Sequence, residues 1–106
     1  MQSSSELIFT ALGDPTRRGI YQHLSQKGAL SVHVLTQLSG ISQPAVSKHL
    51  AQLKKAGLVG DQKRGRETYY GIETQGLEPL KDWIATYSHF WHARLDQLDD
   101  LLTHMD

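Results

Sequence analysis

Hydrophobic positions in the first half of the chain recur at helical spacing, in short segments separated by glycine. A first helix is expected over residues 5–12, capped by Ser5, and Asp14 followed by Pro15 is a typical start of a second helix. A third helix is expected over residues 31–39, before a stop at Gly40. The pattern therefore predicts a bundle of short helices at the N-terminal end.

The next segment, residues 43–56, carries one narrow apolar stripe. Val46, Leu50 and Leu53 repeat at intervals of four and three residues, after a cap at Ser42. Only residues 39–42 separate this segment from the third helix, so the two helices must cross steeply, as in a helix-turn-helix. Any small helical hairpin would share this spacing, so the spacing alone leaves both interpretations open.

After Gly57 the pattern changes from helical to alternating. Residues 58–62 and 67–72 are short runs with β-forming side chains. Between them lies a tip that combines cations with a glycine able to form a tight turn: Lys63, Arg64, Gly65 and Arg66. We expect a hairpin with a basic tip, a wing over about residues 58–72.

A last helix is expected over about residues 78–105, longer than a core this small requires. Its apolar residues follow a heptad pattern that is widened by further aromatic and leucine side chains. We expect them to form a dimer interface with the same helix of a second copy, and the alternative is packing within one chain. The candidate interface residues are Leu80, Ile84, Tyr87, Trp91, Leu98, Leu101 and Met105.

These elements describe one small domain over residues 1–106. The expected fold is mainly α with a small β-hairpin, a winged helix-turn-helix of about five helices. The chain has no cysteine, which excludes disulfides, thiol nucleophiles and thiolate metal sites. The longest uncharged stretch, residues 28–47, contains many polar side chains, so we expect no membrane insertion. With no signal-like N-terminus either, a cytoplasmic protein is expected.

The net charge of zero conceals two charged ends. Residues 42–68 hold six cations against two acids, and residues 77–106 hold two cations against six acids. A basic helix and hairpin beside an acidic far end is typical of a nucleic-acid-binding protein. The coincidence with the helix-turn-helix spacing favours this interpretation over an ordinary solvated surface.

The outward side of the segment over residues 43–56 supplies candidate contacts to bases. Recognition helices place their N-terminal residues against base edges. Gln43 suits adenine, Ser47 suits a base or a phosphate, and Lys48 suits guanine or the backbone. His49 lies at the edge of the apolar stripe, where it is either a DNA contact or a packed, hydrogen-bonded side chain.

Further candidates bring the helix close to DNA or reach its phosphates. Pro44 is small enough to let the helix lie deep in a groove, and Lys55 is placed to reach a phosphate. The complete set of candidate DNA-binding residues is Gln43, Pro44, Ser47, Lys48, His49, Lys55, Lys63, Arg64 and Arg66.

The sequence resembles the ArsR/SmtB family of winged helix-turn-helix repressors. The resemblance is carried by residues 11–18 (ALGDPTRR), 40–50 (GISQPAVSKHL) and 56–59 (AGLV), with Gly65-Arg66 and Tyr69-Tyr70 in the wing. It implies a homodimer that binds an inverted-repeat operator in double-stranded DNA, represses its own or a neighbouring operon, and releases DNA when a signal arrives. The inducer, a small molecule or a protein, is not identified by the sequence.

The metal-sensing motifs of that family are missing from this sequence. The third helix reads SVHVL over residues 31–35, without the cysteine motif of the thiolate sensors. The positions equivalent to the family's second site, on the last helix, carry no typical ligand. A two-residue shift would bring Glu78, His89 and His92 into that site, with His89 and His92 one helical turn apart. We expect no metal and no cofactor, and a histidine and carboxylate zinc sensor is the alternative.

The alternatives from other classes of protein are an enzyme and a winged-helix module that binds only proteins. An enzyme would need converging catalytic groups, and the sequence has no phosphate-binding glycine loop, serine elbow or dense ligand cluster. A winged-helix module that binds only proteins is the second alternative, but such a wing would not need three cations at its tip. The predicted function is DNA-binding transcriptional regulation, and no enzyme activity is expected.

Overall fold

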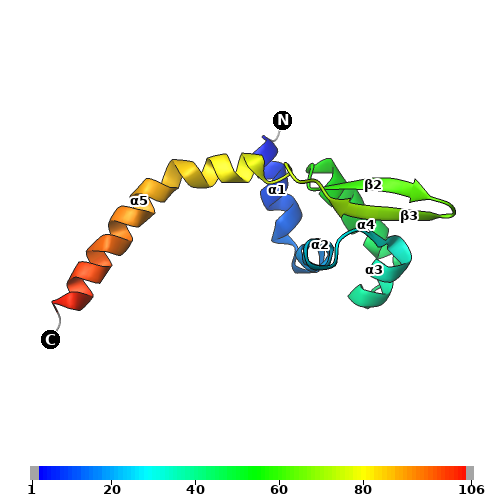
Figure 1. The fold of residues 1–106 in the computed structure, drawn as a ribbon, viewed down its shortest axis with the longest axis horizontal. Helices are drawn as coiled ribbons and strands as arrows, with labels where there is room; N and C mark the ends of the chain where they lie inside the picture. The colour runs from blue at the N-terminus through cyan, green and yellow to red at the C-terminus, as the bar shows by residue number, and fades with distance from the viewer. Residues whose placement is uncertain (1–2, 105–106) are drawn as a thin grey trace.

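The structure is a computed structural model that describes residues 3–104, and these residues form five helices and three strands (Figure 1). The elements are α1 (Ser4–Gly13), α2 (Pro15–Lys27), β1 (Leu30–Ser31), α3 (Val32–Ser39), α4 (Gln43–Lys55), β2 (Val59–Arg64), β3 (Glu67–Ile72) and α5 (Glu78–Thr103). The predicted class, mainly helical with a β wing, is confirmed.

The first two helices are defined by their caps. The cap of α1 is Ser3, so the prediction of Ser5 is wrong. The Ser3 hydroxyl accepts from the Glu6 backbone N–H at 3.3 Å, and the Glu6 carboxylate accepts from the Ser3 N–H at 3.1 Å. This reciprocal pair requires an acidic side chain three residues after the cap, which Ser3 has and Ser5 lacks. Asp14 caps α2, as predicted.

Helices α3 and α4 form the predicted helix-turn-helix. Gly40 ends α3 in the left-handed conformation, with φ of 69°, which only glycine adopts without steric cost. Ser42 then caps α4, and its hydroxyl accepts from the Ala45 backbone N–H at 3.3 Å. Gly40 and Ser42 thus define the turn between the two helices, the first by ending α3 and the second by capping α4.

The wing is a three-stranded antiparallel sheet in the order β1-β3-β2. Strands β2 and β3 form the predicted hairpin, with Arg64 paired to Glu67 across a two-residue turn. Gly65 begins that turn with φ of 64°, as a type II′ turn requires. Strand β1 was not predicted, because two residues are too short to show alternation, and it forms only by pairing with Tyr69 and Tyr70 of β3.

One hydrophobic core lies between the helices and the first residues of the wing. Its buried side chains come from α1, α2, α3, α4 and the start of β2: Ile8, Ala11, Ile20, Leu24, Leu35, Val46, Leu50, Leu53, Leu58 and Val59. The apolar stripe predicted on the fourth helix is therefore fully buried. Packing of this stripe fixes which side of α4 remains exposed.

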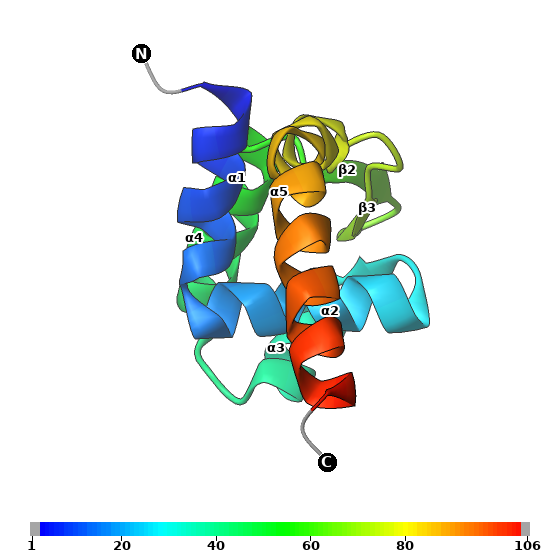
Figure 2. The same ribbon diagram turned by 90° about the vertical axis from the view of Figure 1, so that its left-hand side faces the viewer.

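Helix α5 extends away from this core as a long curved arm (Figures 1 and 2). None of its described residues is buried. Near its start, the Trp83 ring packs edge-on against Phe9 of α1, with centroids 5.0 Å apart. Leu80 also packs against the core of its own chain. Met105, a predicted interface residue, lies outside the described residues.

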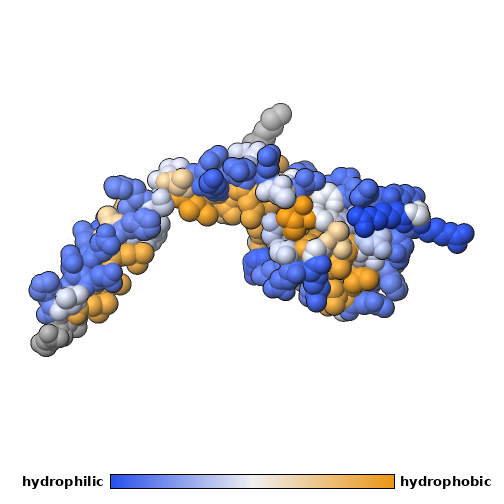
Figure 3. Space-filling model, in the orientation of Figure 1, coloured by the Kyte–Doolittle hydropathy of each residue, from blue (hydrophilic) through white to orange (hydrophobic). Residues whose placement is uncertain are grey.

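The arm leaves large apolar side chains in solvent along one side (Figure 3). They include Trp83, Ile84, Tyr87, Phe90, Trp91, Leu95, Leu98, Leu101 and Leu102, between 44% and 60% exposed. Within residues 3–104, no helix is both long enough and apolar enough to cross a membrane. Apart from the contact of Trp83 with Phe9, the exposed apolar side chains of α5 are not part of the core that the described residues form.

Candidate nucleic-acid interface

Helix α4 presents a polar side to solvent because its apolar side is fixed in the core. Val46, Leu50 and Leu53 are fully buried. At 100° per residue, the positions opposite them point away from the core. The predicted contact residues of this helix that are exposed are Gln43, Pro44, Ser47, Lys48 and Lys55.

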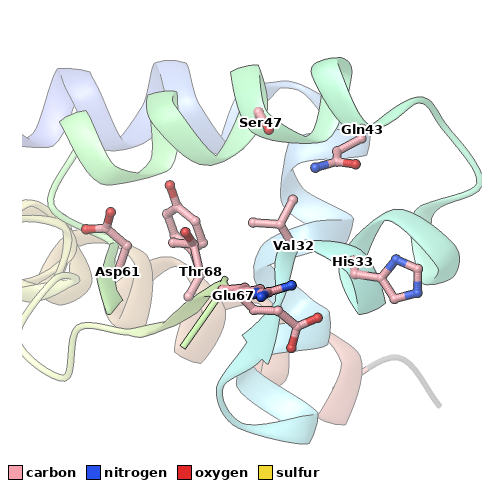
Figure 4. A pocket seen from close by; sticks show the side chains of 9 residues that line it. Val32, His33, Gln43, Ser47, Asp61, Glu67 and Thr68 are labelled. Carbon is pink, nitrogen blue, oxygen red and sulfur yellow. The ribbon is translucent and has the colours of Figure 1, made fainter. Parts of the chain in front are cut away.

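A groove of about 640 Å³ runs between α4, the start of α3 and the wing. Gln43 and Ser47 of α4 line one wall, and Asp61, Glu67 and Thr68 of the wing lie across from them (Figure 4). Arg66 and Tyr70 of the wing also line the groove. His33, at the start of α3, lies at the end of the same groove. The fold thus brings two of the predicted base-reading residues of α4, Gln43 and Ser47, and one predicted wing cation, Arg66, to a single concavity, whereas Lys48 does not line it.

Six residues that line the groove were not among the predicted DNA contacts: Val32, His33, Asp61, Glu67, Thr68 and Tyr70. Val32 and His33 reach the groove from the start of α3, whereas the wing residues reach it through the pairing of β3 with β2, and no spacing in the sequence connects that pairing to α4. A cue was present in the alternation of β3, which places Thr68 and Tyr70 on the same face of the strand.

The three wing cations differ in direction. Lys63 and Arg64 are successive residues of β2, so their side chains leave opposite faces of the sheet. Arg64 lies over the Tyr69 ring, 4.8 Å from its centroid, and donates to the Gln62 side chain at 3.5 Å. Arg66 follows the turn and lines the groove. All three are exposed, so the tip carries its positive charge on both sides of the wing.

An ion pair joins helix α4 to the wing. Lys54 in the last turn of α4 lies 2.8 Å from the Asp61 carboxylate of β2. The hydrogen bond from Lys54 holds the pKa of Asp61 below its ordinary value, and the same bond raises the pKa of Lys54. Lys54 was counted in the basic charge of this region, but its charge is opposed at short range by Asp61.

His49 lies at the flank of α4 that faces α2, away from the wing. Its side chain is partly buried, and its Nδ1 accepts from Nε of Arg17 at 3.4 Å. The Arg17 guanidinium also donates to the carbonyls of Thr10 and Ala11 at the end of α1. Arg17 therefore connects α1, α2 and α4 at one point.

The three candidate metal ligands, Glu78, His89 and His92, all lie on α5 and are exposed. Glu78 is the first residue of the helix, and His89 and His92 are one turn apart near its middle. In the part of the chain that the structure describes, no three histidine, aspartate or glutamate side chains are grouped so that they could hold a metal ion.

Comparison with known proteins supports this arrangement. Residues 12–60 match the family described as "Helix-turn-helix domain". The transcriptional repressor SdpR of Bacillus subtilis is 32% identical over 80 residues, which cover 76% of this chain and 88% of that protein. The crystal structure of the ArsR family transcriptional regulator RHA00566 superposes with a TM-score of 0.74 at 30% identity, covering 84% of this chain and 91% of that one. The chain belongs to the ArsR family.

Another relative is the arsenic resistance transcriptional regulator ArsR1 of Pseudomonas putida. It is 36% identical over 78 residues, which cover 74% of this chain but only 58% of ArsR1. As an ArsR-family protein, the chain is a winged helix-turn-helix DNA-binding transcriptional regulator and not an enzyme. The resemblance found in the sequence is confirmed. This ArsR-family chain has no cysteine.

Proposed function

We propose that this regulator is a homodimer that binds an inverted-repeat operator and represses its own or a neighbouring operon, in the cytoplasm and without a metal ion. The observation that carries the proposal is the groove shared by α4 and the wing, with Gln43, Ser47 and Arg66 on its walls. A helix with amide and hydroxyl groups at its N-terminal end suits base edges in the major groove, and a cation beside it suits phosphate.

The surface around the groove favours DNA over a protein partner. Lys48 and Lys55 are exposed cations of α4, Lys63 and Arg64 are exposed cations of β2, and Arg66 lines the groove itself. Two acids also line the groove: Asp61, which pairs with Lys54, and Glu67, whose carboxylate accepts from the Tyr69 hydroxyl at 3.4 Å. The cations of α4 and the wing outnumber these two acids, so this face offers a net positive charge to backbone phosphates.

The dimer is supported by the apolar face of α5. Ile84, Trp91 and Leu98 recur every seven residues and are 52%, 59% and 49% exposed. An apolar face of this length needs a partner, and a second copy of the same helix offers a matching one. Two-fold symmetry would place two α4 helices on one face of DNA, with half-sites centred about 34–36 Å apart or a multiple of that spacing.

The proposed metal independence rests on the types of metal ligand that the chain can offer. Arsenite and soft metal ions bind thiolates, and the chain has none. We therefore propose that the inducer is a small molecule or a protein rather than a metal ion.

The decisive experiment measures binding to the promoter fragment of the protein's own gene and to a mixed-sequence duplex of equal length. We expect Gln43→Ala and Ser47→Ala to reduce the preference for the promoter, each by about fivefold or more, because base contacts carry specificity. Gln52→Ala, on the same helix but away from the groove, is the matched control. Unchanged preference in both groove variants would show that α4 does not read bases as proposed.

A further inference from the structure

The Arg17 side chain donates hydrogen bonds to two other helices, α1 and α4. Its guanidinium donates to the carbonyls of Thr10 at 3.3 Å and Ala11 at 3.4 Å, and its Nε donates to His49 Nδ1 at 3.4 Å. Its own backbone N–H donates to the Asp14 carboxylate at 2.8 Å. These contacts hold Arg17 at the junction of α1, α2 and α4, so its Nε–H is aimed at one ring nitrogen of His49.

That contact determines where the proton of the neutral imidazole resides. Nδ1 accepts a hydrogen bond and therefore carries no hydrogen, so the ring proton is on Nε2. Within residues 3–104, the buried side-chain polar atoms without a partner are His23 Nδ1 and Ser39 Oγ. His49 Nε2 is not one of them and makes no hydrogen bond in the described chain, so it is open to solvent as an N–H donor.

The position of His49 on α4 indicates what this donor meets. Lys48 points directly away from the core, Ser47 points toward the wing, and His49 points toward α2 on the other flank. A helix lying in the major groove has a sugar–phosphate strand along each flank. The wing lies on one flank, and His49 lies on the other with its Nε2 left without a partner in the described chain.

We propose that Arg17 is a positioning residue that fixes His49 as the Nε2–H tautomer, and that His49 donates this hydrogen to a phosphate oxygen on the α2 side of the recognition helix. The proposal rests on the DNA binding proposed above and adds a contact on the flank opposite the wing. A phosphate contact carries no sequence information, so its loss weakens binding to every duplex equally.

The tautomer is tested first, in the free full-length protein. Long-range ¹H–¹⁵N correlation spectra at mildly alkaline pH distinguish a protonated Nε2 from a protonated Nδ1. We expect the Nε2–H pattern for His49 in the wild type and a mixed pattern in Arg17→Met. Arg18→Met is the matched control, because Arg18 donates at 2.8 Å to the Leu12 carbonyl and makes no bond to His49. A Nδ1–H pattern in the wild type, or an unchanged pattern in Arg17→Met, would overturn the proposal.

The DNA contact is tested with two amides that replace different ring nitrogens. Gln reaches the position of Nε2 and keeps a donor there, whereas Asn reaches only the position of Nδ1. We expect His49→Asn to lower affinity at least about tenfold for the promoter fragment and for the mixed-sequence duplex alike, and His49→Gln to stay within about threefold of the wild type. Thermal unfolding of both variants is measured so that the affinities can be corrected for any difference in the fraction of folded protein.

Equal affinities of the Asn and Gln variants would overturn the phosphate contact while leaving the proposed function intact. A loss confined to the promoter fragment would make His49 a base-reading residue and would also overturn it. Failure of the wild type to bind either duplex at low salt would instead refute the proposed function, whatever the tautomer.

Discussion

The Lys54 ammonium lies 2.8 Å from the Asp61 carboxylate and joins the last turn of α4 to the strand β2 of the wing. The two side chains belong to the elements that form opposite walls of the groove. Their ion pair therefore restricts the angle between the recognition helix and the wing, although it contributes little to stability at an exposed site.

The first prediction concerns the pH dependence of this ion pair. The pKa of Asp61 is lowered by the hydrogen bond from Lys54, so its stabilising contribution is complete above the unfolded value of about 3.9 and is lost as pH falls through the lower folded value. A double-mutant cycle of Lys54→Met and Asp61→Asn in urea unfolding should show a small favourable coupling at pH 7. The coupling should be lost as pH falls through the lowered folded pKa of Asp61, and a coupling that persisted with Asp61 fully protonated would contradict the assigned cause.

The second prediction concerns Gly76, at the turn between β3 and α5. A Cβ at this position would lie 2.6 Å from the carbonyl oxygen of Gly57 and 3.0 Å from Cα of Leu58, both backbone atoms. Gly76→Ala should lower the free energy of unfolding by about 1–3 kcal/mol because backbone must shift. Gly13→Ala, where a Cβ would meet nothing within 4 Å, should be neutral or stabilise by about 0.5 kcal/mol. Equal effects of the two changes in chemical denaturation would refute the close approach.

The third prediction concerns salt. Lys48, Lys63, Arg64 and Arg66 on two protomers would neutralise about six to eight phosphates, so affinity should fall by about 10³ to 10⁵ between 50 and 200 mM salt. Arg64→Ala should weaken binding to all duplexes and reduce the steepness of the salt dependence. Lys81→Ala, an exposed cation on α5, should change neither property. Fluorescence anisotropy titrations at several salt concentrations measure both, and an unaltered slope in Arg64→Ala would remove Arg64 from the contact set.

The fourth prediction concerns the dimer. Leu98 is 49% exposed and does not contribute to the core of its own chain, so Leu98→Asp should leave the fold intact and place a charge in the interface between copies. Sedimentation should show a monomer, with operator affinity reduced by at least about tenfold. Ala93→Asp adds the same charge to the opposite side of α5 and should remain dimeric. A folded Leu98→Asp dimer would exclude this face as the interface.

The fifth prediction concerns metals. Zinc, cadmium and arsenite should not change operator affinity, because the chain has no thiolate. The main exception to test is zinc held by His89 and His92 with Glu78 from a second copy, a site that would weaken at mildly acidic pH as the imidazoles become protonated. Zinc titrations of the protein–DNA complex at neutral and mildly acidic pH measure this. A sub-micromolar zinc effect that His89→Ala abolishes would replace the proposed inducer class with a metal ion.

The elements that the sequence predicted correctly are those encoded by neighbouring residues. Asp14 and Ser42 cap their helices through backbone N–H groups three residues away, and Gly40 and Gly65 supply local turns. The stripe of Val46, Leu50 and Leu53 is likewise readable at helical spacing. The cap of α1, wrongly predicted as Ser5, is also determined locally, because Glu6 lies three residues after Ser3 and completes the capping box with it.

The relationships across the fold were decided only by tertiary structure. Strand β1 exists because β3 pairs with it, and the position of the wing beside α4 brings Thr68 and Tyr70 to the same groove as Gln43. Lys63 and Arg64 are adjacent in sequence but leave opposite faces of the wing. The bond from Arg17 to His49 spans 32 positions, and no spacing in the sequence links the two residues. Such contacts depend on how the helices pack around Ile8, Leu24 and Leu50, and packing is a property of the whole core rather than of any single segment.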